Sequence, residues 1–180
     1  MTASVRLETR VLRSACVKRM TGIEVRHSLA NASASEAANM VLPSNFVELD
    51  WGNLDYLGWR DSHSPHLGYI IQWQGDQAVG IMVREADGPL SRRRMMMCQL
   101  CRATHTEHGV SLFSAKRTGE AGENGNTVGT YICANLGCST NIRVDVPHSS
   151  YYRDPQSLLA EKVSGLEARV TGFMNDVCRA

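Results

Sequence analysis

The sequence has no long hydrophobic run. No stretch approaches the roughly 18 consecutive apolar residues that a membrane-spanning helix needs. Residues 1–19 contain basic residues but lack the continuous apolar centre of a secretory signal. The chain also has almost no net charge, +1 at pH 7, so it is not a polyelectrolyte that coats nucleic acid indiscriminately. We therefore expect a protein of the reducing cytoplasm with no membrane partner.

Motifs of familiar catalytic sites are also missing. Serine and histidine residues occur without a nucleophile-elbow pattern. The glycines Gly119, Gly122 and Gly125 stand among acidic residues and lack the lysine of a phosphate-binding loop. Asp50 and Asp55 form a possible carboxylate pair, but solvated or capping acids are more common than catalytic pairs. We therefore expect neither an enzyme nor a small-molecule substrate.

Four of the six cysteines form two closely spaced pairs. Cys98 and Cys101 have the spacing of a zinc knuckle, a tight turn in which both sulfurs reach one ion at about 2.3 Å. Cys133 should end a strand, and Cys138 should lie in the first turn of a short helix, CSTNIRV. A knuckle followed by a strand-to-helix pair is the layout of a treble clef. Four soft thiolates in a tetrahedron suit Zn²⁺, so the sequence predicts one structural zinc ion without an open coordination position.

Three alternatives to this zinc site stay open. A CxxC pair can act as a redox dithiol, and four cysteines can hold an iron–sulfur cluster. The second cysteine pair and the treble-clef order favour zinc over both. His105 or His108 could replace one cysteine as a ligand. Cys16 and Cys178, near the two ends of the sequence, are interpreted as ordinary free thiols.

The remaining pattern predicts an α+β protein that begins with short helices. Residues 21–42 have helical periodicity in two pieces, and the second piece starts at a capping box formed by Ser33 and Glu36. Pro43 should end that helix. Residues 44–60 are interpreted as an irregular, largely buried connection whose aromatic side chains anchor a core. These aromatic residues are Phe46, Trp51, Tyr56 and Trp59.

Two strand pairs follow and should form a small antiparallel sheet. The β-rich runs at 67–74 and 78–85 flank a three-residue turn signal. A second pair is predicted at 109–117 and 127–133. The loop between them, at 118–126, is polar and rich in glycine, so it should be exposed.

The C-terminal segment predicts a long helix. Asp154 is a good N-cap and Pro155 a good first helical residue. Apolar residues then recur at spacings of four and three, which places them on one helix face. They are Leu159, Val163, Leu166, Val170, Phe173 and Val177. We expect this face to pack within the molecule, against Ile23, Leu29 and Met40, rather than in a coiled-coil dimer.

These elements divide the chain into four parts. Residues 1–20 are an N-terminal extension that we expect to be disordered, because the segment starting at Met20 would itself make a sensible beginning. Residues 21–44 are the N-terminal helical segment, and residues 45–150 are the zinc domain. Residues 151–180 are the C-terminal helix, which should pack with the helical segment.

Several sequence segments resemble the FBP-domain proteins. The run LDYLGWRDSHSPHLGYIIQWQGDQAVGIMVRE is followed by MCQLC, VSLFSAKR, NGNTVGTYIC and LGCSTNIRV. The resemblance covers about residues 45–145 and, less specifically, the C-terminal helix. This elongation-factor-G-binding family includes the fusidic-acid-resistance proteins of staphylococci, and the sequence is more similar to its actinobacterial branch.

The resemblance implies an FBP-type treble-clef zinc-finger domain with a helical portion built from both termini. It places the four paired cysteines, at 98, 101, 133 and 138, at the metal positions of the family. It also implies a function in translation: binding elongation factor G and helping to release it from ribosomes stalled by fusidic acid, an antibiotic-resistance activity.

Two kinds of partner therefore have to be considered. Docking on elongation factor G would use basic and aromatic residues that the sequence places on strands and a helix near the metal. These candidate contacts are Lys116, Arg117, Tyr131 and Arg143, although each residue also has an ordinary surface or core interpretation. Binding to ribosomal or other RNA would instead use the basic run 92–94 beside the knuckle to neutralise phosphates.

Overall fold

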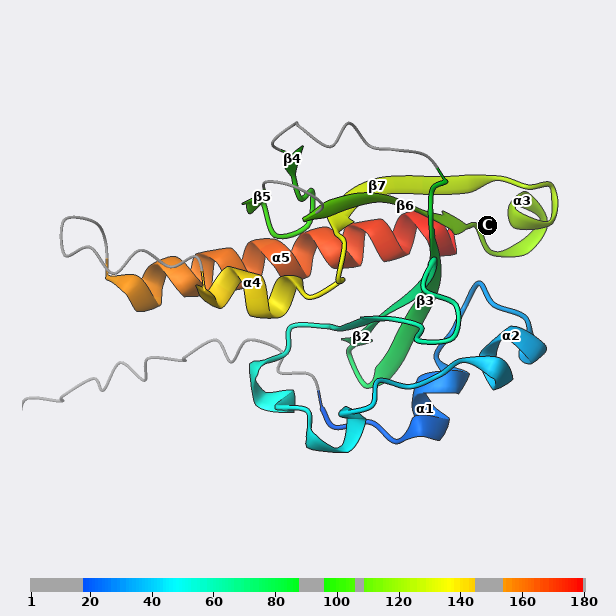
Figure 1. Cartoon of the computed structure of the whole chain (residues 1–180), viewed down its shortest axis with the longest axis horizontal. Helices are drawn as coiled ribbons and strands as arrows, with labels where there is room; N and C mark the ends of the chain where they lie inside the picture. Colours follow the sequence, from blue (N-terminus) through cyan, green and yellow to red (C-terminus); the bar gives the residue numbers. More distant parts are fainter. Residues whose placement is uncertain (1–17, 88–95, 106–108, 145–153, 180) are drawn as a thin grey trace, which may run out of the picture.

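The protein is an α+β structure whose central sheet separates two groups of helices (Figure 1). The computed structural model of the 180-residue chain describes residues 18–87, 96–105, 109–144 and 154–179. Within these ranges, one antiparallel sheet has the strand order β1-β2-β3-β6-β7. Its strands are β1 (Leu57–Arg60), β2 (Leu67–Gln74), β3 (Gln77–Glu85), β6 (Val110–Lys116) and β7 (Thr127–Cys133).

Both predicted strand pairs are confirmed as hairpins. The turn between β2 and β3 is shorter than expected: Gln74 pairs with Gln77, so only Gly75 and Asp76 form the loop. Gly75 has φ +63°, which glycine adopts without strain at the first position of a two-residue turn. The four-residue strand β1 was not predicted, because its sequence lies inside the aromatic segment interpreted as irregular.

The two hairpins share one sheet but diverge from each other. The β3 strand pairs with β6 only through Arg84–Ser114 and Glu85–Phe113. Beyond this junction, the segment after the first helix occupies the edge of β3. The side chain of Asn31 accepts from Met82 N at 2.8 Å and donates to the carbonyls of Met82 and Lys116 at 3.0 and 2.9 Å. Asn31 therefore bridges the hairpins where their ladder ends.

The N-terminal helices form where the capping residues predict them. The first is α1 (Gly22–His27) and the second α2 (Ala34–Asn39), and the predicted capping box of Ser33 and Glu36 is present. The α2 helix ends at Asn39, before Pro43. Two short 3₁₀ turns, η1 (Phe46–Glu48) and η2 (Trp51–Asn53), then lead into β1.

The remaining elements surround the second hairpin. A short helix, α3 (Gly119–Glu123), forms in the β6–β7 segment that was predicted as an exposed loop. The small ladder of β4 (Met96–Met97) and β5 (Thr104–His105) precedes β6, and α4 (Cys138–Val144) follows β7. The long helix α5 (Pro155–Cys178) begins as predicted, with the Asp154 carboxylate accepting from backbone N–H groups of its first turn. No described helix combines the length and hydrophobicity needed to cross a bilayer.

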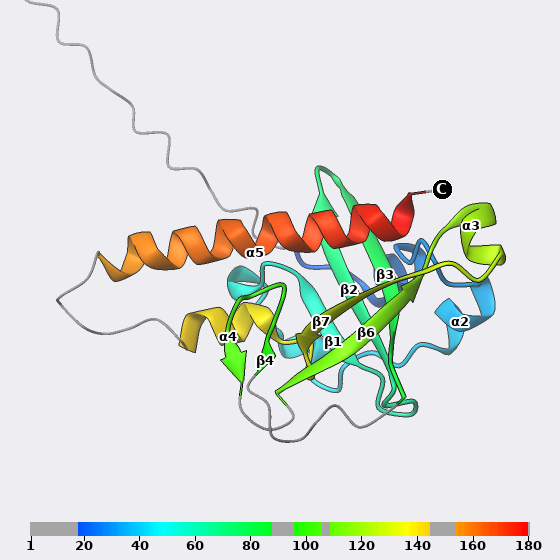
Figure 2. The ribbon, with the colours of Figure 1, turned by 90° about the horizontal axis from the view of Figure 1, so that it is seen from above.

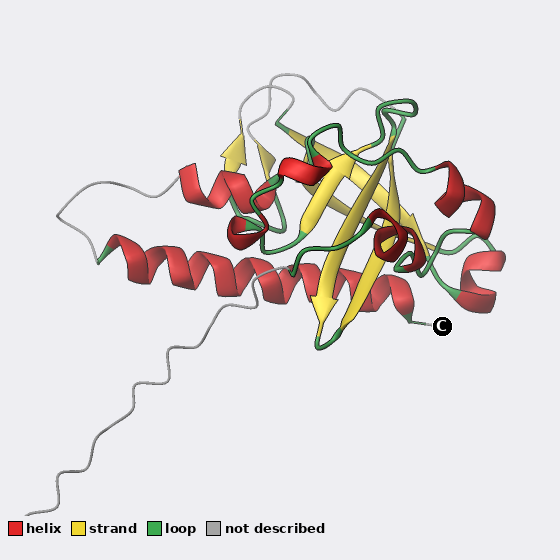
Figure 3. Ribbon diagram, turned by 90° about the horizontal axis from the view of Figure 1, so that it is seen from below, coloured by secondary structure: helices red, strands yellow, loops and turns green. Residues whose placement is uncertain are grey.

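Two hydrophobic cores lie on opposite faces of the β2–β3 hairpin, because alternate strand residues point to opposite sides. On one face, Ile70 and Ile81 belong to a core shared with α5, β6, β7 and the cysteines. On the other face, Tyr69 and Ile71 belong to a core shared with α1 and the segment before β1. Figure 2 shows α5 running across this hairpin, and Figure 3 shows the N-terminal elements on the opposite side.

The prediction that α5 packs against the N-terminal helices is wrong. The apolar face of α5 belongs to the first core, whereas Leu29 and Met40 belong to the second, and Ile23 is 68% exposed. The α5 helix instead contacts α4, β3 and β7. Periodicity correctly identified the buried face of the helix, but it carries no information on which surface covers that face.

The fold also begins earlier than the predicted boundary at residue 20. Met20 is only 2% exposed and belongs to the second core. The Lys18 carbonyl accepts from the Trp73 indole N–H at 2.9 Å. Lys18 and Met20 are thus part of the folded protein, while residues 1–17, on which most of the predicted extension falls, lie outside the described residues.

Replacing Leu166 and Ile23 in turn by alanine tests this arrangement. Leu166 is fully buried, so Leu166→Ala should lower the free energy of unfolding by about 2–5 kcal/mol through lost burial and a residual cavity. Ile23→Ala removes an exposed side chain and should change it by less than about 0.5 kcal/mol. Denaturant unfolding of both variants provides the measurement. The observed packing would be contradicted if Ile23→Ala lowered the free energy of unfolding strongly and Leu166→Ala lowered it only slightly.

Candidate metal centre

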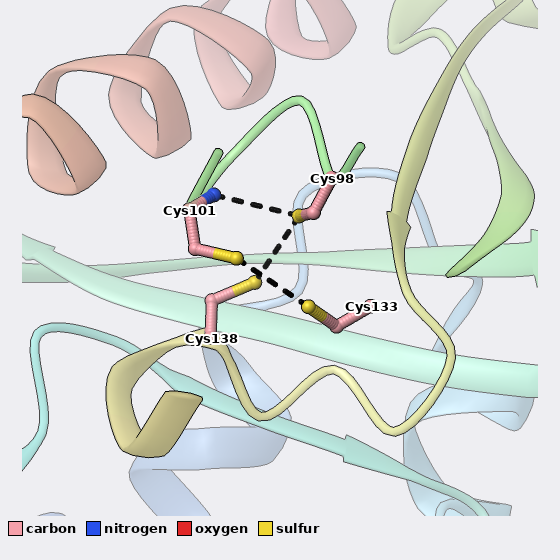
Figure 4. A group of neighbouring side chains, drawn as sticks. All are labelled: Cys98, Cys101, Cys133 and Cys138. Atoms are coloured by element: carbon pink, nitrogen blue, oxygen red, sulfur yellow. Dashed lines mark hydrogen bonds between the residues drawn. The ribbon is translucent and has the colours of Figure 1, made fainter. Parts of the chain in front are cut away.

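Four cysteine sulfurs converge beside the first core (Figure 4). Cys98 and Cys101 lie in the turn between β4 and β5, Cys133 is the last residue of β7, and Cys138 is the first residue of α4. All four residues are buried, and their Sγ atoms lie within 4.8 Å of one another. The order of knuckle, hairpin and helix confirms the treble clef.

The spacing of the sulfurs fits a tetrahedral metal ion. Four sulfurs at about 2.3 Å from a central Zn²⁺ would lie about 3.8 Å from one another. The Sγ–Sγ distances are 3.6 Å for Cys98–Cys138 and 3.5 Å for Cys101–Cys133. A disulfide needs about 2.05 Å, and all four cysteines are free thiols. The thiol set therefore suits a soft cation with four protein ligands.

Without a cation the four thiols compete for protons. Hydrogen bonding from neighbouring thiols lowers the pKa of Cys98 and of Cys101. The complementary hydrogen bonds to Cys101 raise the pKa of Cys133 and of Cys138. Four thiolate charges this close together would also repel one another. A divalent cation would replace the remaining protons, because metal binding requires all four thiolates.

Backbone hydrogen bonds shape the knuckle that carries the first two sulfurs. Cys98 N donates to Ala103 O at 2.9 Å, and Arg102 N donates to Cys98 O at 2.9 Å, which closes the turn. Cys101 N donates to the sulfur of Cys98 at 3.4 Å. Gln99 N donates to Tyr131 O at 2.7 Å, so the knuckle is fixed to β7. These contacts hold the first two ligands independently of the metal.

A second tight turn presents the other two sulfurs. Leu136 N donates to Cys133 O at 2.8 Å, and Leu136 has φ +58°. Asn141, one turn into α4, donates its side-chain N–H to the sulfur of Cys133 at 3.2 Å. A hydrogen bond of this kind orients a thiolate and stabilises its charge.

Tyr56 supports this turn from the segment before β1. Its hydroxyl donates to Leu136 O at 2.6 Å and accepts from Cys138 N at 3.3 Å. Burial raises the pKa of Tyr56 well above its usual value, so the side chain stays a neutral phenol. The neighbouring Gly58 allows the same close approach, because a Cβ there would lie 2.4 Å from Leu136 O. Sequence analysis placed Tyr56 in the core but did not connect it to the metal centre.

Arg143, a predicted partner contact, has a structural role in this arrangement. Its guanidinium forms a bidentate ion pair with the buried carboxylate of Asp55, at 2.8 and 3.0 Å. The Ser139 hydroxyl accepts from Asp55 N at 3.1 Å. Asp55 is 3% exposed, so removing Arg143 would leave a buried charge without its main partner. Arg143 therefore joins α4 to the start of β1.

The other predicted contacts do not form one surface near the metal. Tyr131 is half-buried and pairs with Leu112 near the cysteine end of β7. Lys116 is exposed and pairs with Thr127 at the opposite end. Arg117 lies beyond Lys116, and its guanidinium donates to the Asp176 carbonyl of α5. Lys116 and Leu112 are four residues apart on an extended strand, a distance of about 13 Å. Arg117, one residue beyond Lys116, is therefore far from the cysteine end of β7, and the expectation that it lies close to the metal is wrong.

Several residues considered as alternatives can now be placed. Backbone pairing puts His105 opposite Met96 in the β4–β5 ladder. Cys178 is a free thiol near the end of α5, away from the cluster. His108, Cys16 and the basic run 92–94 lie outside the described residues. Among the described residues, the four paired cysteines alone form a group that could hold a metal ion.

Comparison with protein families identifies this arrangement. The model of the family described as FBP C-terminal treble-clef zinc-finger matches residues 24–177. The chain belongs to this family. No curated protein and no solved structure matches the chain. Because the FBP match extends from α1 to α5, it includes the cysteines and, apart from Met20, the buried residues of both cores. The family and its four-cysteine centre together support zinc binding.

Replacing Tyr56 by phenylalanine tests the contact between the aromatic segment and the metal centre. The change keeps the ring but leaves the Leu136 carbonyl and Cys138 N–H without their hydroxyl partner. We expect metal affinity to fall about 10- to 100-fold, as for other groups that orient metal ligands. Competition with a chromophoric chelator gives the measurement. Tyr69→Phe is a matched control, because its hydroxyl contacts Asp61. Equal affinities in wild type and Tyr56→Phe would show that the hydroxyl does not support the site.

Proposed function

We propose that this FBP-family protein holds one structural Zn²⁺ and binds elongation factor G through its treble-clef domain. The observation that carries the proposal is the family match over residues 24–177. The arrangement of the four sulfurs supports zinc as the ion. Its role would be structural, because four buried thiolates leave no open coordination position for catalysis. By analogy with fusidic-acid-resistance relatives, the bound factor would be released from stalled ribosomes.

Zinc would contribute to binding by pre-organising the domain. The ion joins the knuckle, the end of β7 and the start of α4, which come from separate parts of the sequence. A surface fixed in this way loses less conformational entropy on association than a flexible one. The ion itself would not contact the partner, because its ligands are buried.

We place the principal contact at the cysteine end of β7. Tyr131 offers a half-buried aromatic ring on a strand that the knuckle holds through Gln99 N. Met97, two residues before Gln99, is an exposed apolar side chain, 40% accessible. Rigid aromatic and apolar groups of this kind are typical centres of protein interfaces. Lys116, the last residue of β6, lies beside the other end of β7 and would form a separate charged rim that mainly affects the association rate.

Direct binding to ribosomal RNA is the alternative function. Its main sequence signal, the basic run 92–94, lies outside the described residues, so the structure adds no contact geometry to it. Dependence on salt separates the two functions. Binding through several phosphates weakens steeply between 50 and 200 mM salt, roughly by factors of 10³–10⁵ for six to ten contacts, whereas an apolar protein interface changes much less.

Elemental analysis and a cysteine variant test the identity and role of the ion. Purified protein should contain about one zinc per chain, because the four thiolates form one closed site. Cys133→Ser should lose the zinc and destabilise the second hairpin and α4, since metal binding and folding are coupled. Cys178→Ser, remote from the cluster, is the control. Stoichiometric iron, or a Cys133→Ser variant as stable as wild type, would contradict a structural zinc site.

Calorimetric titration against the cognate elongation factor G tests the function. Zinc-loaded wild type should bind with a dissociation constant in the micromolar range or lower. Tyr131→Ala should weaken binding by on the order of 2–4 kcal/mol if Tyr131 is a central contact, while zinc content stays unchanged. Lys116→Ala should have a smaller effect that diminishes at higher salt. Lys18→Ala, on the N-terminal part, serves as the control.

The outcomes of this titration have different meanings. Folded, zinc-loaded wild type that does not bind would exclude elongation factor G as the partner and favour RNA. Normal binding by Tyr131→Ala would keep the function but reject the surface at the cysteine end of β7. Arg143→Ala is unsuitable for mapping the interface, because it breaks the buried ion pair with Asp55.

A further inference from the structure

A pocket of about 260 Å³ lies beside the metal centre, between the knuckle, α4 and α5. Its charged lining comes from Arg102 on the knuckle and from Glu161, Lys162 and Arg169 on α5. Three cations and one carboxylate give these side chains a formal charge of +2, and the metal-binding Cys101 also lines the pocket. Neither Tyr131 nor Lys116, the candidate contacts for elongation factor G, lines this pocket.

Arg102 occupies a backbone position that favours glycine. Its φ of +62° lies in the left-handed region, which glycine adopts readily and a branched side chain does not. The turn would therefore be less strained with glycine at this position. This position instead carries an arginine that lines the pocket, and its Nη1 donates to the Gln99 side chain at 2.9 Å.

Arg169 depends on a second residue that is unfavourable at its position, a glycine inside the α5 helix. Its guanidinium lies over Gly165, where a Cβ would come within 2.9 Å of Nη1. Glycine is a poor residue for the interior of the 24-residue helix α5. Here it makes room for the arginine, whose Nε donates to the Leu100 carbonyl of the knuckle. The two remaining guanidinium nitrogens have no hydrogen-bond partner among the described residues.

Both unfavourable positions thus place an arginine, Arg102 or Arg169, in the lining of the same pocket. Burial lowers the pKa of Arg169 and the nearby charge of Arg102 lowers it further, whereas the neighbouring cysteines, Cys101, Cys98 and Cys138, act in the opposite direction. No carboxylate of the described residues forms an ion pair with either arginine. Local violations of residue preference are expected at functional sites. An anion between the two groups would relieve their repulsion.

We propose that this pocket binds a phosphate group, carried by an RNA backbone or by a free nucleotide. Guanidinium groups present paired N–H donors that match phosphate oxygens, and Lys162 adds a third cation from the α5 side. The pocket also has apolar walls at Ile142 and Leu158, against which a ribose or base could lie. This inference is independent of binding to elongation factor G.

Titration of zinc-loaded protein with inorganic phosphate, adenosine monophosphate and a short single-stranded RNA tests the proposal. Arg102→Gly removes one guanidinium while relieving the backbone, and Lys162→Gln removes the cation that Lys162 adds from α5. Each should weaken phosphate binding about tenfold or more, the effect of losing one charge-assisted hydrogen bond. Arg84→Gln is the matched control, because Arg84 is exposed on β3 and lies outside this pocket.

The pattern across probes identifies the source of the phosphate. Binding of RNA that competes with phosphate and is lost in both variants would assign the pocket to an RNA backbone. Binding of the mononucleotide without RNA binding would assign it to a free nucleotide. The proposal would be overturned by absence of binding to all three probes, or by equal weakening in Arg84→Gln. It would also be overturned if Arg102→Gly lost zinc but kept phosphate binding, since the arginine would then serve only to offset the thiolate charge.

Discussion

The structure depends on the placement of four sulfurs that cannot all ionise without a cation among them. They are buried within 4.8 Å of one another, where four thiolate charges alone would repel strongly. An ion that neutralised them would also close the chain between Cys98 and Cys138, which includes β5, β6 and β7. Coordination would then hold the second hairpin and α4 at one point, beside the first core.

Polar contacts extend this constraint into the rest of the sheet. Tyr56 supports the turn between Cys133 and Cys138, and the ion pair of Asp55 with Arg143 fixes α4 to the same segment. Arg60, in β1, donates to the Ala134 carbonyl in the metal-binding turn and forms an ion pair with Glu85 of β3. The aromatic segment before β1 thus acts as a bridge between the metal centre and the first hairpin.

The sequence allowed prediction of features that are encoded locally. Cysteine spacing identified the four ligands, and the capping residues Ser33 and Asp154 marked helix starts, because each signal involves residues close together in the chain. The supporting contacts could not be found this way: Tyr56 and Leu136 are 80 residues apart, and Asp55 and Arg143 are 88 apart. The prediction of what α5 packs against was wrong for the same reason, since the apolar face of a helix does not specify which surface covers it. The ion pair of Arg143 with Asp55 was likewise not predicted, because an arginine in sequence looks the same whether it meets solvent or a buried carboxylate.

The division of the apolar residues into two cores has a consequence for a chain that is short of metal. Among the described residues, the second core, with Met20, Trp59 and Ile71, contains no cysteine, so its packing does not require the ion directly. A metal-depleted chain would retain this half while the other face of β2 and β3 lost its cover. Ile70 and Ile81 would then be accessible on a folded remnant, which is the kind of surface that chaperones and proteases recognise. Metal supply could in this way set the lifetime of the protein in the cell as well as its shape.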